Sequence, residues 1–123
     1  MNTSAKAYKK VARQIADPRD MEADLLLGAA SRLQAIQDHW EHNKHQFTAA
    51  LLHNRKLWMI FLTDVTSNES PLPIEIRQNV ANLGLFVINH TLAISRDPHP
   101  AQLSILININ RQIAAGLQGR AAV

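Results

Sequence analysis

The sequence contains three long apolar helical faces, and each of them carries a polar residue near its centre. At about 100° per residue, the apolar residues between 47 and 65 fall on one stripe of a helix, with Asn54 in its middle. Asn110 lies in the middle of a similar apolar stripe in residues 101–117, and His90 lies in the middle of a third stripe in residues 76–94. A buried amide without a hydrogen-bond partner costs roughly 1–3 kcal/mol. We therefore expect these side chains to bond to one another, to the backbone or to a bound partner, which restricts how the helices can meet.

Catalytic chemistry is not indicated. Nothing nucleophilic or acidic stands beside the three polar residues on their faces, and no phosphate loop, dinucleotide fingerprint or nucleophile elbow occurs. His39, His42 and His45 recur at every third position, but Asn43 and Lys44 indicate that their helix is ending. We therefore expect a solvent-exposed helix end there and no metal site. The pattern favours a helical binding protein without a cofactor over an enzyme.

Five helices are expected to account for almost the whole chain, as one all-α domain over residues 1–123. Short connections predict a small bundle in which most neighbours are antiparallel. Asp17-Pro18 provides an N-cap followed by a proline at the first helical position, so a new helix should begin there. The expected helices cover a short amphipathic stretch at 8–15 and then, approximately, 18–42, 46–67, 73–96 and 101–117. We interpret residues 1–16 as an N-terminal helix able to move, and residues 118–123 as a flexible tail.

Charge and composition predict a cytoplasmic location and weigh against RNA as a direct partner. The chain has no cysteine, no apolar signal-peptide core and no apolar run of the ~18–20 residues that a membrane span needs, so we expect a cytoplasmic protein. The net charge of +3 is mild. Four basic residues cluster near the start of the chain, but RNA-binding modules usually add stacking aromatic residues, and only Tyr8 lies nearby. The basic residues are Lys6, Lys9, Lys10 and Arg13. Direct RNA binding is therefore disfavoured but left open.

The helix expected at 73–96 is apolar on two sides. Leu85, Ile88 and Leu92 lie roughly opposite the stripe that includes Val80 and Val87. The last helix is also broad, because Ile105 and Ile109 widen its apolar arc. Either one of these helices is central to the bundle, or the extra surface forms a groove for a partner helix or a homodimer seam.

Other charged residues are assigned structural roles. Glu22 projects toward the apolar side of its helix and Arg55 follows Asn54, so the two are expected to form an ion pair between helices. Asp64, near the end of its helix, is a candidate cap or ion-pair partner. His90 is expected to be a core histidine bonded to a backbone carbonyl, to Asn54 or to Asn110.

An ordered series of motifs runs through the chain. Tyr8 is followed by Asp17-Pro18-Arg19-Asp20-Met21-Glu22, Asn54-Arg55-Lys56-Leu57-Trp58 with Asp64, Leu72-Pro73 with Arg77, Phe86-Val87 with His90-Thr91, and Leu106-Ile107-Asn108-Ile109-Asn110-Arg111 with Gly116-Leu117. This series resembles the FlaF family of flagellar biosynthesis proteins from alphaproteobacteria. The resemblance extends from Tyr8 to Leu117.

The resemblance implies a non-enzymatic cytoplasmic helper of flagellin that works beside FlbT, a regulator acting on flagellin mRNA. From the residues, we expect the groove for an amphipathic flagellin helix on the last two long helices. Its apolar anchors would be Leu85, Ile88, Leu92, Ile105 and Ile109, with Asn108 bonding the client at the edge. Two alternatives stay open: direct action on flagellin mRNA or through FlbT, and a homodimer seam in place of the client groove.

Overall fold

The computed structural model describes residues 18–119, and within them the protein is all-α with no strand. Four long helices form the bundle, which confirms the predicted fold class. They are α2 (Pro18–Asp38), α4 (Phe47–Thr66), α5 (Ile74–Arg96) and α6 (Leu103–Leu117). The short α3 (Trp40–Asn43) and two 3-10 turns, Lys44–Gln46 and Pro100–Gln102, lie in the connections. The helix expected at 8–15, the whole N-terminal stretch of residues 1–16 and residues 120–123 of the expected tail lie outside the described residues.

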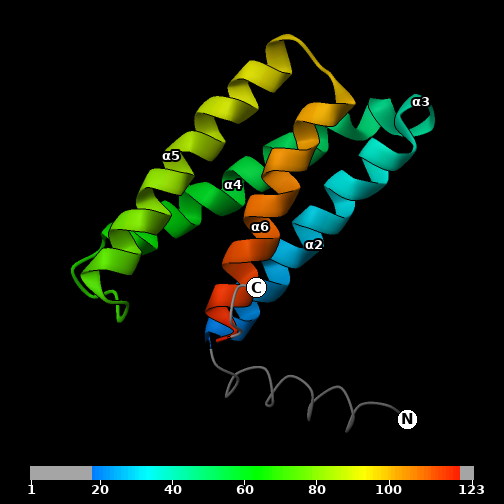
Figure 1. Ribbon diagram of the computed structural model, residues 1–123. Coiled ribbons are helices and arrows are strands. Elements are labelled where there is room, and N and C mark those ends of the chain that lie inside the picture. The colour runs from blue at the N-terminus through cyan, green and yellow to red at the C-terminus, as the bar shows by residue number, and fades with distance from the viewer. Residues whose placement is uncertain (1–17, 120–123) are drawn as a thin grey trace, which may run out of the picture.

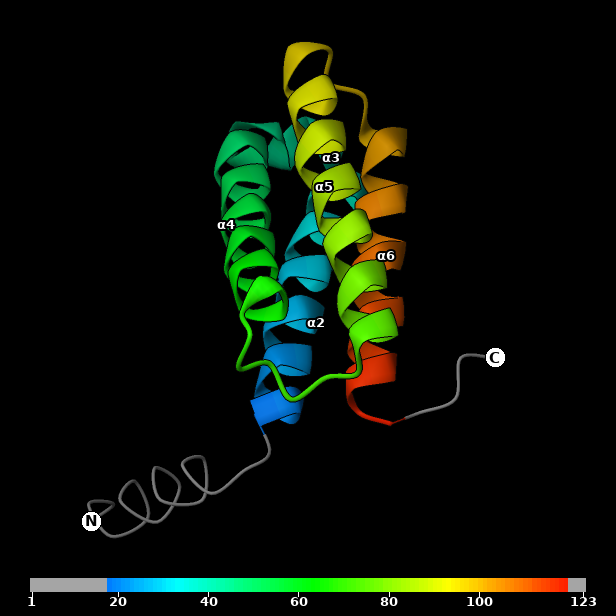
Figure 2. The same cartoon turned by 90° about the vertical axis from the view of Figure 1, so that its left-hand side faces the viewer.

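The four long helices alternate in direction, so each is antiparallel to the next along the chain (Figure 1). α2 packs mainly against α6 and also against α4, whereas α5 packs mainly against α4. Figure 2 shows α5 in front, with α4 and α6 on either side of it and α2 behind. α5 is therefore held chiefly by one neighbour, and this arrangement decides where surface remains open.

Proline and the turn residues set the helix boundaries in the positions expected from the sequence. α2 begins at Pro18 and carries Asp20 in its first turn, where negative charge suits the helix dipole. α5 begins directly after Pro73, and Pro100 is at the start of the turn that leads into α6. The arginine of α5's first turns, Arg77, donates from Nη1 to the carbonyl of Ser67 at 3.1 Å and so ties the 67–73 loop to the helix.

A glycine allows α4 and α5 to approach closely. Gly84 is buried on α5 together with Val80, Val87, Thr91 and Ile94, which share one face. A Cβ atom at position 84 would lie 2.8 Å from the side chain of Leu62 on α4. The absence of a side chain at Gly84 thus sets the distance between the two helices.

Three side chains from α4 and α6 form a hydrogen-bonded cluster in the core, and each of them is fully buried. The Nδ2 of Asn110 donates to the Oδ1 of Asn54 at 2.7 Å and to the carbonyl of Leu26 on α2 at 3.3 Å. The indole Nε1 of Trp58 donates to the Oδ1 of Asn110 at 2.9 Å. One amide thus joins three helices, and the two asparagines bond to each other as their positions suggested.

The two asparagines are not equivalent. All of the Asn110 side-chain polar atoms are hydrogen bonded, whereas the Nδ2 of Asn54 has no partner among the described residues. Removing Asn110 leaves the Trp58 indole and Asn54 without their partners, while removing Asn54 takes only one acceptor from Asn110. Asn110 is therefore the centre of the cluster.

We predict that Asn110→Ala lowers the free energy of unfolding by roughly 3–5 kcal/mol, because it creates a cavity and leaves two buried groups unpaired. Asn54→Ala should cost only roughly 1–3 kcal/mol, since it removes a single acceptor. Urea titrations of both variants and of the double variant give the coupling free energy between Asn54 and Asn110. It should exceed about 1 kcal/mol, because the two residues are in direct contact. Equal losses in the two single variants would contradict the central role of Asn110.

We also predict that Gly84→Val lowers the free energy of unfolding by about 1–3 kcal/mol, because the added atoms overlap Leu62. Gly28→Ala is the matched control: Gly28 lies inside α2, and a Cβ there meets nothing within 4 Å. That change should stabilise the protein by roughly 0.5–1 kcal/mol through helix propensity alone. Thermal unfolding of both variants tests the pair, and a neutral Gly84→Val would show that the helices do not need this close approach.

Candidate functional site

α5 and α6 each pack mainly against a different helix and diverge from the loop that joins them (Figure 1), and a cavity lies between them near the start of α5. We call the surface between these two helices the α5–α6 groove. Ile76 and Ile113 line the cavity from the two helices. At 100° per residue, Leu83 and Phe86 lie within about 80° of Ile76 on α5, and Ile105 and Ile109 within about 80° of Ile113 on α6, so we assign them to the same two walls. Phe86 is 45% exposed and Ile105 is 44% exposed, so the groove presents large apolar side chains to solvent. At the end near the start of α5 it deepens into a cavity of about 310 Å³ between Ile76, Asn79, Ile113 and Gly116.

His90 closes the other end of the groove. Its Nε2 lies 3.3 Å from the carbonyl oxygen of Gln102, just before α6, and its ring stacks on Phe86 with centroids 5.4 Å apart and an angle of 11° between the planes. A backbone carbonyl is therefore the partner of this histidine. His90 is only partly buried, and the buried polar residue of α5 is Thr91, whose hydroxyl donates to the carbonyl of Val87. The predicted backbone-carbonyl partner is thus observed, but His90 lies beside the packed face of Val80, Gly84, Val87, Thr91 and Ile94 and not in the core.

The apolar anchors expected from the sequence are divided between two surfaces. Ile105 and Ile109 line the α5–α6 groove. Leu85 and Leu92 are about 140–160° around α5 from His90, which points toward α6, so they lie on the far side of the helix. Ile88 is half buried on that same far side. The idea that all five residues line one groove is therefore wrong, since periodicity gives positions on a helix but not the neighbour that each face meets.

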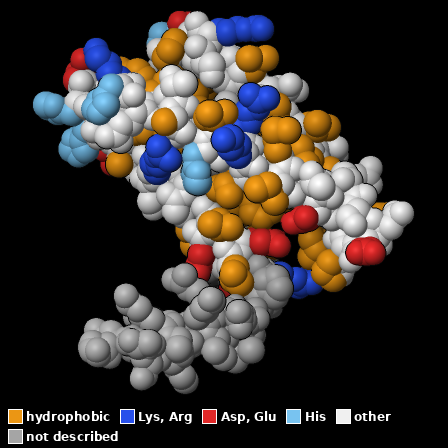
Figure 3. Space-filling model, turned by 180° about the vertical axis from the view of Figure 1, so that it is seen from behind, with side chains coloured by type: hydrophobic (Ala, Val, Ile, Leu, Met, Phe, Trp, Pro, Cys, Tyr) orange, Lys and Arg blue, Asp and Glu red, His pale blue; other side chains and the backbone are white. Residues whose placement is uncertain are grey.

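The far side of α5 forms a second apolar surface together with α4. Leu62 on α4 lies opposite Gly84 on α5. Because the two helices are antiparallel, Met59 then lies at about the same height along the helices as Ile88, and Leu52 at about the same height as Leu92. We call these residues, with Leu85, the α4–α5 face; Leu52, Met59, Leu85 and Leu92 are exposed on it. Figure 3 shows the back of the molecule, where apolar side chains form several patches with Lys and Arg among them.

Asn108, expected at the edge of the client groove, is exposed on α6. It lies about 60° around the helix from Ile105 and about 100° from Ile109. Its contact with a client therefore stays a prediction.

The charged residues assigned structural roles do not form the expected pair. Arg55 is exposed on α4, and no ion pair joins it to Glu22 in the described part of the chain. Glu22 instead lines a pocket with Asp64, between the start of α2 and the end of α4. The side chain of Asp64 is exposed, and it is the backbone carbonyl of this residue that accepts from the amide of Ser67 at the helix end.

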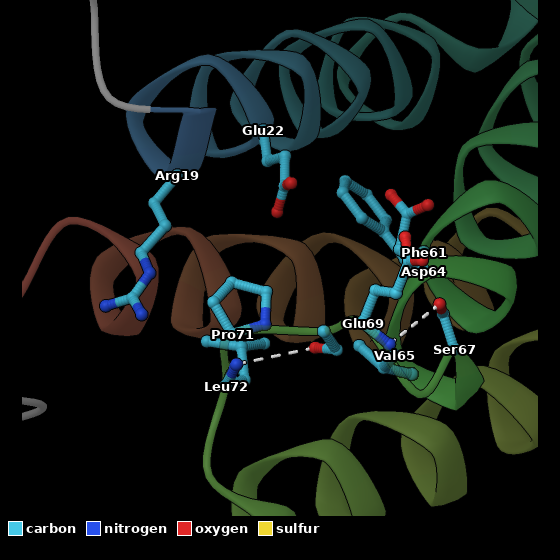
Figure 4. A pocket seen from close by; sticks show the side chains of 10 residues that line it. Arg19, Glu22, Phe61, Asp64, Val65, Ser67, Glu69, Pro71 and Leu72 are labelled. Atoms are coloured by element: carbon cyan, nitrogen blue, oxygen red, sulfur yellow. Dashed lines mark hydrogen bonds between the residues drawn. The ribbon is translucent and has the colours of Figure 1, made fainter.

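This pocket, which we call the loop pocket, has a volume of about 620 Å³. Its apolar lining comes from Phe61, Val65, Pro71 and Leu72, and its charged lining from Arg19, Glu22, Asp64 and Glu69 (Figure 4). Helical periodicity does not predict this pocket, because its wall is the 67–73 loop. The sequence indicated an ordered wall only through Pro71-Leu72-Pro73, which stands within an otherwise polar loop.

Metal-binding and membrane-spanning features do not occur in the described region. Within residues 18–119, no three histidine, aspartate or glutamate side chains converge to hold a metal ion. In the same region, no helix has the length and apolar character needed to span a bilayer.

Comparison with known proteins gives one result. A family model described as flagellar protein FlaF matches residues 4–117. No curated protein and no solved structure matches the chain. The matched region includes all four long helices, the α5–α6 groove and the loop pocket. Because the match covers nearly the whole length, the chain belongs to the FlaF family of flagellar proteins.

Proposed function

We propose that this flagellar protein binds flagellin in the cytoplasm as a secretion chaperone and thereby promotes flagellin synthesis and export. The observation that carries the proposal is the open α5–α6 groove with large apolar side chains on both walls. The terminal segments of flagellins are amphipathic helices that must stay unpaired before export. Such a helix has apolar residues at i, i+3, i+4 and i+7, which is the spacing that a groove between two helices accepts.

The groove offers the features expected of a helix-binding site. Phe86 and Ile105 supply large exposed anchors on opposite walls, and the 310 Å³ cavity between Ile76 and Ile113 can receive one apolar side chain of the client. The Phe86–His90 stack and the contact of His90 with the Gln102 carbonyl hold one wall in place. No group with a catalytic partner lines the groove in the described region, so binding is the activity that it supports.

The alternative function, regulation of flagellin mRNA directly or through FlbT, depends on other residues. The basic cluster Lys6, Lys9, Lys10 and Arg13 lies outside the described residues, and the groove itself is apolar. RNA binding would fall steeply with salt as counterions are released, whereas binding of an apolar helix would change little. Measuring the affinity at two salt concentrations therefore separates the two functions.

We predict that Ile105→Asp weakens binding to the flagellin of the same genome at least about tenfold, because it places a charge in an apolar contact. Leu92→Asp is the matched control, since Leu92 is similarly exposed but lies on the α4–α5 face. It should leave the affinity unchanged. Size-exclusion chromatography with light scattering shows whether a 1:1 complex forms, and titration calorimetry gives the dissociation constants.

Two results would contradict this assignment. Loss of binding in Leu92→Asp but not in Ile105→Asp would move the client site to the α4–α5 face. Failure of the unmodified protein to form any complex with soluble flagellin would overturn the chaperone function, and a doubled mass without flagellin would favour a homodimer. Circular dichroism of each variant checks that the helices are retained.

A further inference from the structure

The loop pocket combines an apolar floor with an acidic rim. Phe61 and Val65 are buried at its base, and Leu72 is half buried at its side. Glu22, Asp64 and Glu69 provide three carboxylates around it, against the single guanidinium of Arg19 (Figure 4). A pocket of this kind suits a helix or strand with an apolar stripe and basic residues at its flanks.

The wall of the pocket is held in place by hydrogen bonds within the 67–73 loop. The amide of Glu69 donates to the hydroxyl of Ser67 at 3.2 Å, and the amide of Leu72 donates to the hydroxyl of Ser70 at 3.4 Å. Arg77 binds the Ser67 carbonyl from α5. These bonds order the loop that forms one wall of the pocket.

Two of the rim carboxylates have no partner in the described part of the chain. The side chains of Asp64 and Glu69 accept no hydrogen bond there, form no ion pair and are exposed. They are thus available to a cationic group from outside residues 18–119. Their position beside an apolar floor distinguishes them from ordinary surface acids.

The chain supplies a segment with matching chemistry. Residues 4–17 precede α2 directly, and Arg19, two residues after this segment, already lines the pocket. Tyr8, Val11 and Ile15 follow apolar helical spacing. The segment also contains Lys6, Lys9, Lys10 and Arg13 and has no acid before Asp17. As a helix, residues 8–15 would be about 12 Å long, which is short enough to lie against one pocket.

We propose that the loop pocket is the docking site of the chain's own N-terminal segment, residues 4–17. The apolar stripe of the segment lies on the floor around Phe61 and Leu72, and its basic residues pair with Asp64 and Glu69. The loop pocket adjoins the cavity at the end of the α5–α6 groove, with which it shares Arg19 and Leu72, but the docking does not require the client. Docking would cover the exposed Pro71 and the half-buried Leu72 at the end of the bundle.

A pair of introduced cysteines tests the docking in the full-length chain, which contains no native cysteine. Val11→Cys is combined with Pro71→Cys, an exposed residue that lines the pocket. In the control, Val11→Cys is combined with Asp24→Cys, which is exposed and about 160° around α2 from Glu22. Under mild oxidation, the pocket pair should form a disulfide within one chain about tenfold faster than the control pair, because docking raises the effective concentration of the two thiols.

Charge reversal tests the electrostatic contribution. Lys9→Glu with Arg13→Glu should slow disulfide formation in the pocket pair about tenfold, and Asp64→Lys with Glu69→Lys in the same chain should restore the rate. Equal rates for the pocket and control pairs would overturn the proposal, as would a disulfide that forms only between two chains. A rate unaffected by charge reversal would contradict the role of the rim. The disulfide experiments contain no flagellin, so a negative result in them does not contradict the proposal that the protein binds flagellin.

Discussion

The hydrogen bonds of Asn110 are the constraint on which the rest of the bundle depends. Its amide bonds to Asn54 on α4 and to the backbone of α2, and its carbonyl oxygen accepts from Trp58. Apolar side chains can pack in several rotations of a helix, but these bonds form in one arrangement only, and leaving them unmade inside the core costs roughly 1–3 kcal/mol for each group. The cluster therefore fixes the rotation of α6 against α2 and α4. Once α6 is fixed in this way, Ile105 and Ile109 have to face the groove.

α5 has no comparable polar link to the core. Its buried polar residue, Thr91, bonds to its own helix, and its packed face is built from Val80, Gly84, Val87 and Ile94 against α4. A helix that packs mainly against one neighbour leaves both of its flanks open. This explains why α5 contributes to two apolar surfaces, the groove that it shares with α6 and the face that it shares with α4. The two apolar stripes in the sequence of this helix follow from that position.

Sequence periodicity predicted the helices well, because their limits depend on local signals. Pro18, Pro73 and Pro100 mark the starts of structure, and Asn54 and Asn110 stood out as polar residues within apolar stripes. The grouping of Leu85 with Ile105 failed for a physical reason. A helical wheel gives the angle between residues on one helix but not which neighbour each face meets. Gly84 held part of that information, since a glycine inside a helix can mark a close helix contact, and it does lie on the packed face of α5.

The difference between the two halves of the bundle has a consequence for binding. The α2–α6 half is joined by extensive packing and by the Asn110 cluster, whereas the groove wall formed by α5 packs mainly against α4 and has no buried polar link to another helix in the described region. Elements with fewer buried contacts open at lower free energy than the core. The wall that carries Phe86 is tied to the start of α6 at its His90 end, so we expect it to adjust mainly toward the start of α5. For the proposed client binding, this difference predicts that α5, rather than α6, shifts to accommodate apolar side chains of different sizes.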